Sequence, residues 1–315
     1  MRKRIFITGG AGFIGANFVK YLLDKGGFDL TVYDNLSVCT RDNLKKAIKD
    51  SKKKGKVKFV KGDILDAAKL NKSIKEHSAV VHLAAHTQVV ESLKIPKKNF
   101  EINTIGTLNV LEATRMNKIK RFVFASSNAA VGEQIPPINE KMVPRPLSPY
   151  GATKLHGEAL CSAYFNSYDL ETVSLRFANA YGPYSEHKTS VVAKFLRRVK
   201  ESKKLEIYGD GRQTRDFIHA QDISQAIFLA LKACGGTCKS SPFGEVFQVA
   251  TGEETKITDL SKKINSVKGS KGNVKFSPSR KGEIRKNFSD ITKAKKMLKF
   301  KPQITLTQGI LNLLD

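Results

Sequence analysis

Two side chains that suit proton transfer lie one helical turn apart, at Tyr150 and Lys154. An i, i+4 spacing places both on one face of a helix. A phenol ordinarily ionises near pH ~10 and is a poor base at neutral pH, and a nearby cation lowers that value by roughly 1–3 units. Lys154 by itself does not lower the pKa of Tyr150 as far as neutral pH. The pair therefore demands a second positive charge beside the phenol.

A glycine-rich turn near the start of the chain predicts the source of that charge. The run Arg4–Thr8 reads as a buried strand, and it leads through Gly9, Gly12 and Gly15 into an apolar helical stretch. Gly9 permits the tight turn, Gly12 lets backbone N–H groups approach a pyrophosphate, and Gly15 lets the helix pack close to the strand. The phosphates then lie at the positive end of the helix, and Phe13 and Ile14, between Gly12 and Gly15, are also expected to contact the cofactor.

The next predicted strand ends in an acid, Asp34, which lies 19 residues after Gly15. A carboxylate at this distance accepts the adenosine ribose hydroxyls of a dinucleotide and repels a 2′-phosphate. The sequence therefore predicts NAD, rather than NADP, as the cofactor. An oxidised nicotinamide ring is the second positive charge that Tyr150 needs.

Short apolar runs alternate with helical patterns, which predicts an α/β fold with a doubly wound parallel sheet. Long helices are expected at about 96–116 and 150–168, and shorter ones at 191–201, 258–267 and 291–298. The predicted strands are 4–8, 29–33, 57–61, 79–83, 121–126 and 171–176, with a later one at 246–249 that returns to the sheet edge. We expect an NAD-binding Rossmann domain over residues 1–178, joined by a returning segment near 245–267. Residues 179–315 then form mainly a smaller α+β substrate domain, and the cleft between the two is the expected ligand site.

Composition narrows the class of protein. The chain has 315 residues, enough for one or two domains. No stretch resembles a signal peptide or a membrane span, so a cytoplasmic protein without a membrane partner is expected. The scattered cysteines are Cys39, Cys161, Cys234 and Cys238, and no metal site is expected.

The formal net charge of +26 is the unusual feature of the composition. Nucleic-acid binding is one interpretation. The lysines are spread along the whole chain and are not interleaved with stacking aromatics, which favours a solvated basic surface instead. Such a surface also attracts a polyanionic substrate such as a nucleotide diphosphate.

Taken together, these motifs resemble the extended short-chain dehydrogenase/reductase family, specifically its NAD-dependent sugar-nucleotide epimerases and dehydratases. The resemblance covers nearly the whole chain, and it implies further cofactor contacts after three strands. These are Asp34, Asn35 and Ser37 at the adenosine ribose, Asp63 and Ile64 at the adenine, and Leu83, Ala84 and Ala85 beside the dinucleotide.

The resemblance also implies the substrate contacts and the third catalytic residue. Asn179, Arg215 and Arg280 lie in segments like those that hold the nucleotide diphosphate in this family, and an arginine fork suits phosphate oxygens. Ser127 occupies the place of the catalytic Ser or Thr, with Ser126 as the alternative. A hydroxyl there bonds the substrate oxygen and relays a proton to Tyr150.

Residues 128 and 129 separate two reaction types of the family. Its 4,6-dehydratases carry an Asp-Glu pair there, as acid and base for the elimination of water, whereas this chain has Asn128 and Ala129. The sequence therefore predicts an isomerase, a 4-epimerase of UDP-glucose and UDP-galactose. Asn287 stands where epimerases restricted to unmodified hexoses carry a bulky Tyr, which extends the expected substrates to UDP-N-acetylhexosamines.

Alternatives remain open at this point. Uronate epimerases, decarboxylases and keto-sugar reductases use the same scaffold, and some relatives of the fold are non-catalytic dinucleotide sensors or RNA-binding proteins. Relatives of that last kind typically lack the Tyr or the Lys, which this chain keeps. The resemblance also implies a homodimer, formed through the helices at 96–116 and 150–168.

Overall fold

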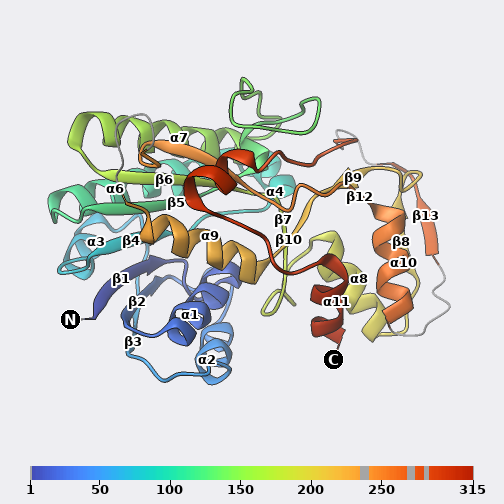
Figure 1. Ribbon diagram of the computed structural model, residues 1–315, viewed down its shortest axis with the longest axis horizontal. Coiled ribbons are helices and arrows are strands. Elements are labelled where there is room, and N and C mark those ends of the chain that lie inside the picture. Colours follow the sequence, from blue (N-terminus) through green and yellow to red (C-terminus); the bar gives the residue numbers. More distant parts are fainter. Residues whose placement is uncertain (1, 235–240, 268–273, 280–283, 315) are drawn as a thin grey trace.

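A seven-stranded parallel sheet forms the centre of the structure (Figure 1). The computed structural model describes residues 2–234, 241–267, 274–279 and 284–314. The strand order is β11-β6-β5-β4-β1-β2-β3. The strands are β1 (Lys3–Thr8), β2 (Phe28–Asp34), β3 (Val57–Lys61), β4 (Ala79–His82), β5 (Arg121–Ser127), β6 (Glu171–Phe177) and β11 (Glu245–Val249). β1 pairs with both β2 and β4, so the chain order reverses beside β1, where open α/β sheets bind their ligands.

Helices cover both faces of this sheet, as the apolar strands require (Figure 1). On one face, α1 (Phe13–Lys25) and α9 (Ala220–Lys232) bury residues such as Phe18 and Ile227 in the larger core cluster. On the other, α3 (Ala67–Ser73), α6 (Gly106–Met116) and α7 (Pro149–Tyr168) contribute residues such as Leu111 and Tyr164 to a second cluster. α2 (Asp42–Lys49) lies against α1.

A separate apolar cluster joins the later elements, and it includes Phe195, Ile207, Leu260 and Ile310. These come from α8 (Val191–Lys200), β8 (Leu205–Tyr208), α10 (Ile257–Val267) and α11 (Leu306–Leu314). Three two-stranded sheets complete the described part: β7 (Asn179–Tyr181) with β10 (Phe217–His219), β9 (Thr214–Arg215) with β12 (Thr255–Lys256), and β8 with β13 (Val274–Ser277).

Every strand predicted for the main sheet is present, with ends that differ by a residue or so. The helix predicted at 96–116 is instead α5 (Pro96–Phe100), a π-helical turn at Glu101–Ile105, and α6. α9 has no counterpart among the helices that the sequence predicts. The C-terminal helix predicted at 291–298 has a π-helical turn at Ala294–Leu298.

The predicted boundary between the two domains, at residues 178 and 179, stays a prediction. The core clusters show which elements pack on the main sheet and which pack in the later cluster. β11 joins the main sheet beside β6, as the returning segment required. α10 lies in the same predicted segment but packs in the later cluster through Leu260 and Ile264. α9, beyond the predicted boundary, packs on the main sheet.

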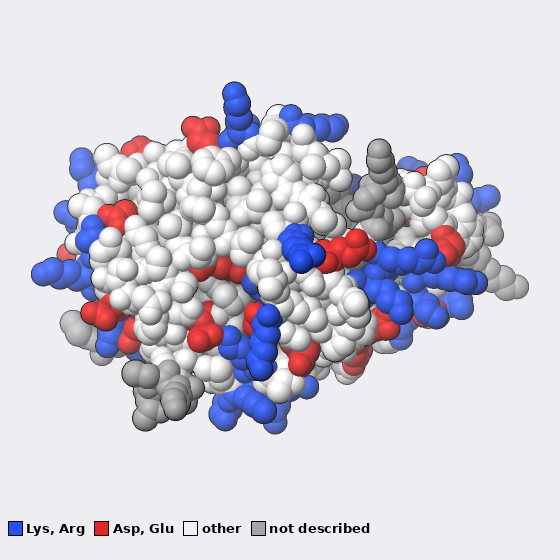
Figure 2. Space-filling view, turned by 90° about the horizontal axis from the view of Figure 1, so that it is seen from above, with Lys and Arg blue, Asp and Glu red and all other residues white. Residues whose placement is uncertain are grey.

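Charge is unevenly distributed over the surface. Figure 2 shows basic side chains gathered toward the end of the molecule that carries α8 and α10, beside a broad central area with neither sign of charge. The last turn of α8 carries three basic residues, Arg197, Arg198 and Lys200. Within the described ranges, no helix combines the length and the apolar composition that a membrane crossing requires.

Candidate active site

The start of α7 places the two residues with which the sequence argument began. Ser148 is the N-cap, and its Oγ accepts a hydrogen bond from the Gly151 N–H at 3.1 Å, while Pro149 occupies the first turn. Because Tyr150 and Lys154 follow at i and i+4, both face the sheet, and both are buried. The helix thus presents the phenol and the ammonium side by side at the carboxyl end of β5.

Three predicted catalytic residues come together there. The Ser127 hydroxyl donates a hydrogen bond to the Tyr150 oxygen. The Lys154 Nζ donates to the carbonyl of Ala125 at 2.7 Å and lies 6.0 Å from the centroid of the Tyr150 ring. The cluster therefore joins a hydroxyl, a phenol and a cation at the point where β5 meets α7.

Burial shifts both titrating groups away from their charged forms. It raises the pKa of Tyr150 to about 12, against the smaller lowering by the Ser127 hydrogen bond. It lowers the pKa of Lys154 to about 8, and the negative charge of Glu158 opposes that shift. Lys154 therefore stays protonated at neutral pH, but its charge alone leaves the phenol a weak base. This is the shortfall that a cationic ring would make up.

The neighbouring hydroxyl of Ser126 has a different role. It donates to Glu158 Oε1, and Glu158 also holds Arg176 through two hydrogen bonds, from Nε at 2.8 Å and from Nη2 at 2.7 Å. Glu158 and Arg176 are both about 95% buried or more. Ser126 therefore belongs to a buried ion-pair cluster, and Ser127 is the hydroxyl that faces Tyr150.

The glycine turn after β1 has the form that a dinucleotide phosphate requires. A Cβ on Gly9, whose φ is +68°, would lie 2.6 Å from the Ala84 nitrogen, and one on Gly15 would lie 2.3 Å from the Gly9 oxygen. Close packing thus explains those two glycines. At Gly12 the nearest atom to such a Cβ is 3.3 Å away, so its missing side chain leaves space for a ligand. Gly12 is also the N-cap of α1, and no described side chain caps that helix.

This arrangement fits NAD. The first turn of α1, with Phe13 and Ile14, directs backbone N–H groups toward the space beside Gly12, where a phosphate completes the helix terminus. At the end of β2, Asp34 accepts hydrogen bonds from the N–H groups of Ala11 at 3.0 Å and Leu36 at 2.9 Å. Asp34, the acid predicted to bind the ribose, is therefore hydrogen-bonded to the glycine turn itself.

The other predicted cofactor residues line the same edge of the sheet. The Asn35 amide donates to Asp63 Oδ2 at 2.8 Å, and the Ser37 N–H donates to Asn35 Oδ1 at 2.9 Å. Ile64, which follows Asp63, is buried under α6. The three loops that follow β1, β2 and β3 are thereby linked around one position, the one expected for the adenosine.

Leu83, Ala84 and Ala85 follow β4, and the Ala84 N–H donates to Thr8 Oγ1 at 3.3 Å. His82, which precedes them, lies between Thr8 and Thr107, with ring nitrogens 2.7 Å and 3.0 Å from their hydroxyls. Burial lowers the pKa of His82 to about 3. This neutral histidine supports the strand ends that are expected to border the cofactor.

The predicted substrate residues are only partly described. Asn179 begins β7, and its N–H donates to the carbonyl of Asp216 at 3.0 Å, so it lies beside the strand that carries Arg215. The Arg215 Nη1 donates to the carbonyl of Ile284 at 2.8 Å. Arg280 lies outside the described residues, as do Lys281–Glu283 of its motif and Cys238.

Two positions that the sequence treated separately are in contact. Asn128 Nδ2 donates to Ser289 Oγ at 2.9 Å and lies 3.4 Å from Asn287 Oδ1. Asn128 and Asn287 are both more than 90% buried. The small side chain of Asn287 therefore lies beside Asn128, the residue that follows Ser127 in the sequence.

Sequence reasoning missed two features of the site. Glu158 continues the series 150, 154, 158 along one face of α7, so its spacing was an available signal. Lys188, which contacts Thr87 close to the strand ends, carries no local signal in a chain with so many lysines.

Comparison with known proteins places this site in a family. The family model described as GDP-mannose 4,6 dehydratase matches residues 6–313. The chain belongs to this family of extended short-chain dehydrogenase/reductases. It is therefore an NAD-dependent enzyme of the sugar-nucleotide epimerase and dehydratase group.

Individual relatives are similar over nearly their whole length. A putative UDP-glucose 4-epimerase of Methanocaldococcus jannaschii is 34% identical over 97% of this chain and 95% of its own. The solved UDP-N-acetylglucosamine 4-epimerase of Methanobrevibacter ruminantium, in complex with UDP-N-acetylmuramic acid, has a TM-score of 0.90 at 31% identity and covers 99% of this chain and 97% of its own. A UDP-glucuronic acid 4-epimerase variant of Bacillus cereus, solved with NAD, has a TM-score of 0.88 at 30% identity, with 98% and 96% covered.

Proposed function

We propose that this protein is a UDP-hexose 4-epimerase. The observation that carries the proposal is the cluster of Ser127, Tyr150 and Lys154 beside the glycine turn, with Asn128 and Ala129 in the positions where a dehydratase needs its acid and base. Neither an amide nor a methyl group transfers a proton at neutral pH. The site thus holds the groups for alcohol oxidation and ketone reduction, and lacks those for the loss of water.

The mechanism assigns one task to each residue. When bound, NAD supplies reversible acceptance of the C4 hydride. Tyr150, as phenolate, takes the proton of the sugar 4-hydroxyl and later returns it, while Ser127 bonds the same oxygen and relays that proton. Lys154 would hold the nicotinamide ribose of bound NAD, and its positive charge would lower the pKa of Tyr150 from the raised value that burial imposes.

Binding of the substrate's diphosphate is assigned to residues that do not contact the sugar. Asn179, Arg215 and Arg280 hold the diphosphate while the 4-keto hexose turns over and presents its other face. Holding the nucleotide and leaving the sugar free is what such a rotation requires. Of the three, Asn179 donates its N–H to the carbonyl of Asp216, the residue that follows Arg215.

The deciding experiment is incubation of the purified protein with UDP-glucose and no added reductant. Formation of UDP-galactose, with NAD still bound afterwards, is the expected result. A product that forms only with stoichiometric NAD(P)H identifies a reductase and overturns the proposal. Parallel incubation with UDP-glucuronate tests for a uronate epimerase.

We also propose that the site accepts 2-acetamido sugars, because Asn287 is small and lies beside Asn128, next to Ser127. UDP-N-acetylglucosamine should be epimerised. Asn287→Tyr should reduce that activity far more than activity on UDP-glucose, and Ser279→Tyr, a residue of the same segment outside this contact, serves as the control. Equal losses on both sugars would contradict the assignment.

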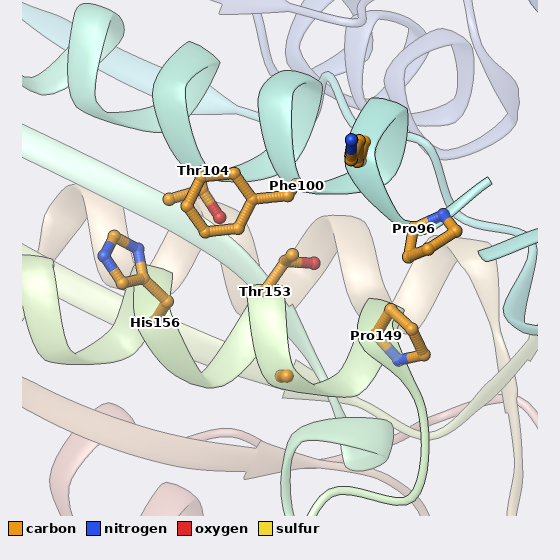
Figure 3. A pocket seen from close by; sticks show the side chains of 8 residues that line it. Pro96, Phe100, Thr104, Pro149, Thr153 and His156 are labelled. Atoms are coloured by element: carbon orange, nitrogen blue, oxygen red, sulfur yellow. The ribbon is translucent and has the colours of Figure 1, made fainter. Parts of the chain in front are cut away.

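We propose further that a second copy of the chain covers the outer faces of α5 and α7. These helices border an apolar groove of about 580 Å³, into which Phe100 and Thr104 project from one side and Pro149, Thr153 and His156 from the other (Figure 3). The Phe100 side chain is 52% exposed there. Light scattering should report a dimer, and Phe100→Glu should shift it to monomer while leaving the fold unchanged.

A further inference from the structure

A short segment after β7 is fastened across two helices of the cofactor side. Residues 183–188, here called the strap, begin at Pro183, whose carbonyl accepts a hydrogen bond from Asn17 of α1 at 2.9 Å. The carbonyl of Tyr184 accepts one from Asn43 of α2 at 3.2 Å. Asn17 lies only two residues after Gly15. The strap is therefore held close to the start of α1.

Tyr184 fixes the strap further. Its hydroxyl donates to Asp50 Oδ2 at 2.8 Å, and its ring is buried against Ala16 of α1 and Ala47 of α2. The residue has a φ of +63°, a left-handed conformation that a non-glycine residue adopts only when its surroundings hold it. The position of the strap's last residue is thus set by the cofactor side of the molecule.

The last residue of the strap is Lys188, and its side-chain ammonium lies between the loops that follow β4 and β2. Its Nζ donates to Thr87 Oγ1 at 3.3 Å, in the loop that begins with Leu83–Ala85 after β4. It also interacts electrostatically with Cys39, in the loop that follows Asp34 after β2. These two loops flank β1 and its glycine turn. The backbone of Lys188 is held as well, because its N–H donates to Ser185 and its carbonyl accepts from Arg197.

Among the residues that the structure describes, the ammonium of Lys188 has no protein counter-ion. Within the described ranges it forms no ion pair, and Cys39 is the titratable group whose charge acts on it. Burial lowers the pKa of Lys188 from its ordinary value. A partly buried cation without a partner costs free energy, and an anion placed beside it recovers that cost. The glycine turn and the start of α1 bind such an anion.

We propose that Lys188 binds the diphosphate of the bound dinucleotide, so that the end of the strap contributes to the cofactor site. The inference does not depend on which sugar the enzyme epimerises. The same chemistry would suit the diphosphate of the sugar nucleotide, and the experiment separates the two sources.

The test measures NAD and UDP binding to Lys188→Met, Lys188→Arg and wild-type protein. Calorimetry on protein freed of NAD gives both dissociation constants, and gel filtration of the holoenzyme gives the NAD retained per protomer. Loss of a charge-assisted hydrogen bond should weaken NAD binding of Lys188→Met by about 10–100-fold. Lys188→Arg keeps the charge and should stay within about threefold of wild type.

Lys200→Met is the matched control, because it removes one exposed lysine from the end of α8 without touching the strap. It should leave both affinities unchanged. Tyr184→Phe is a second variant, which loosens the strap while keeping Lys188, and it should weaken NAD binding to a smaller extent.

Two results would overturn the proposal. One is NAD affinity within about twofold of wild type in a folded Lys188→Met protein. The other is a loss of UDP affinity with NAD affinity retained, which would assign Lys188 to the substrate diphosphate instead.

Discussion

Two neighbouring regions on the buried face of α7 treat their charges in opposite ways. At the first, Tyr150 and Lys154 are buried without an ion pair, and burial displaces the pKa of each toward its neutral form. One turn later, Glu158 and Arg176 are equally buried but are joined by two hydrogen bonds. The comparison separates catalysis from support: the first region keeps two buried groups whose charges are not paired with each other, and the second pairs its two opposite charges within the protein.

The largest effect should follow from Tyr150→Phe, which removes the proton acceptor and little else. Turnover should fall by about 10²–10⁴-fold, the usual contribution of general acid–base catalysis, while NAD stays bound. Tyr164→Phe is the matched control, since its hydroxyl lies on the same helix but donates to Glu112 at 2.6 Å. Steady-state rates and bound NAD are the measurements. Activity in Tyr150→Phe equal to that of Tyr164→Phe would show that the phenol does not carry the proton.

The supporting region should respond in stability. Glu158→Gln removes the negative charge that pairs with the buried Arg176 guanidinium, and breaking such a pair typically costs about 3–5 kcal/mol. Urea unfolding measures the loss. The double variant Glu158→Leu, Arg176→Met removes both charges and should recover much of that stability, because neither is then left unpaired. A double variant less stable than Glu158→Gln would contradict this. It would show that the ion pair itself contributes more to the free energy of unfolding than the cost of leaving one charge unpaired.

Removal of the Lys154 charge should stabilise the fold, because a buried ammonium without an ion-pair partner among the described residues costs free energy. Its pKa in the folded protein is about 8, against an ordinary 10.5, so the folded state binds its proton more weakly than the unfolded state does. The resulting penalty is present below pH 8 and disappears as the pH rises to 10.5. In the absence of NAD, Lys154→Met should therefore be more stable than wild type at pH 7, by on the order of 1–3 kcal/mol.

The pH dependence of that difference is the sharper measurement. Thermal unfolding at pH 7 and pH 10 should show the advantage of Lys154→Met shrinking at the higher pH. Lys154→Met that is less stable at pH 7 would mean that the hydrogen bond to Ala125 and the charge of Glu158 outweigh burial. Turnover in the proposed reaction should be lost in either case, so stability and function separate at this residue.

The contrast between the two regions also marks how far the sequence could be interpreted. The spacing of Tyr150 and Lys154, the glycine turn and Asp34 follow local rules of helix periodicity and strand-turn-helix geometry, so their positions could be predicted. Arg176 pairs with a residue from another element, and no local pattern marks that contact. The resemblance assigns Ser127 with Ser126 as the alternative, but no local pattern predicts the contact of Ser126 with Glu158 that bears on this choice.

Other differences have the same cause. The π-helical turn at Glu101–Ile105 places one extra residue in a helix whose apolar pattern predicts a regular one. The strap and Lys188 depend on contacts with α1 and α2 that lie more than a hundred residues earlier in the chain. Interactions of that range are set by the packing of the whole fold, and a pattern within one segment does not contain them.

The smallest effect should come from an exposed counterpart of the Glu158–Arg176 pair. Glu112 holds Arg115 through the same two contacts, from Nε at 3.0 Å and from Nη2 at 2.8 Å, but its side chain is 35% exposed. Water already solvates both groups there, so Glu112→Gln should shift Tm by no more than about 2 °C. Glu158→Gln and Glu112→Gln make the same substitution in the same bidentate geometry, so calorimetry on both isolates burial. Equal shifts would mean that geometry, and not burial, sets the cost of breaking these pairs.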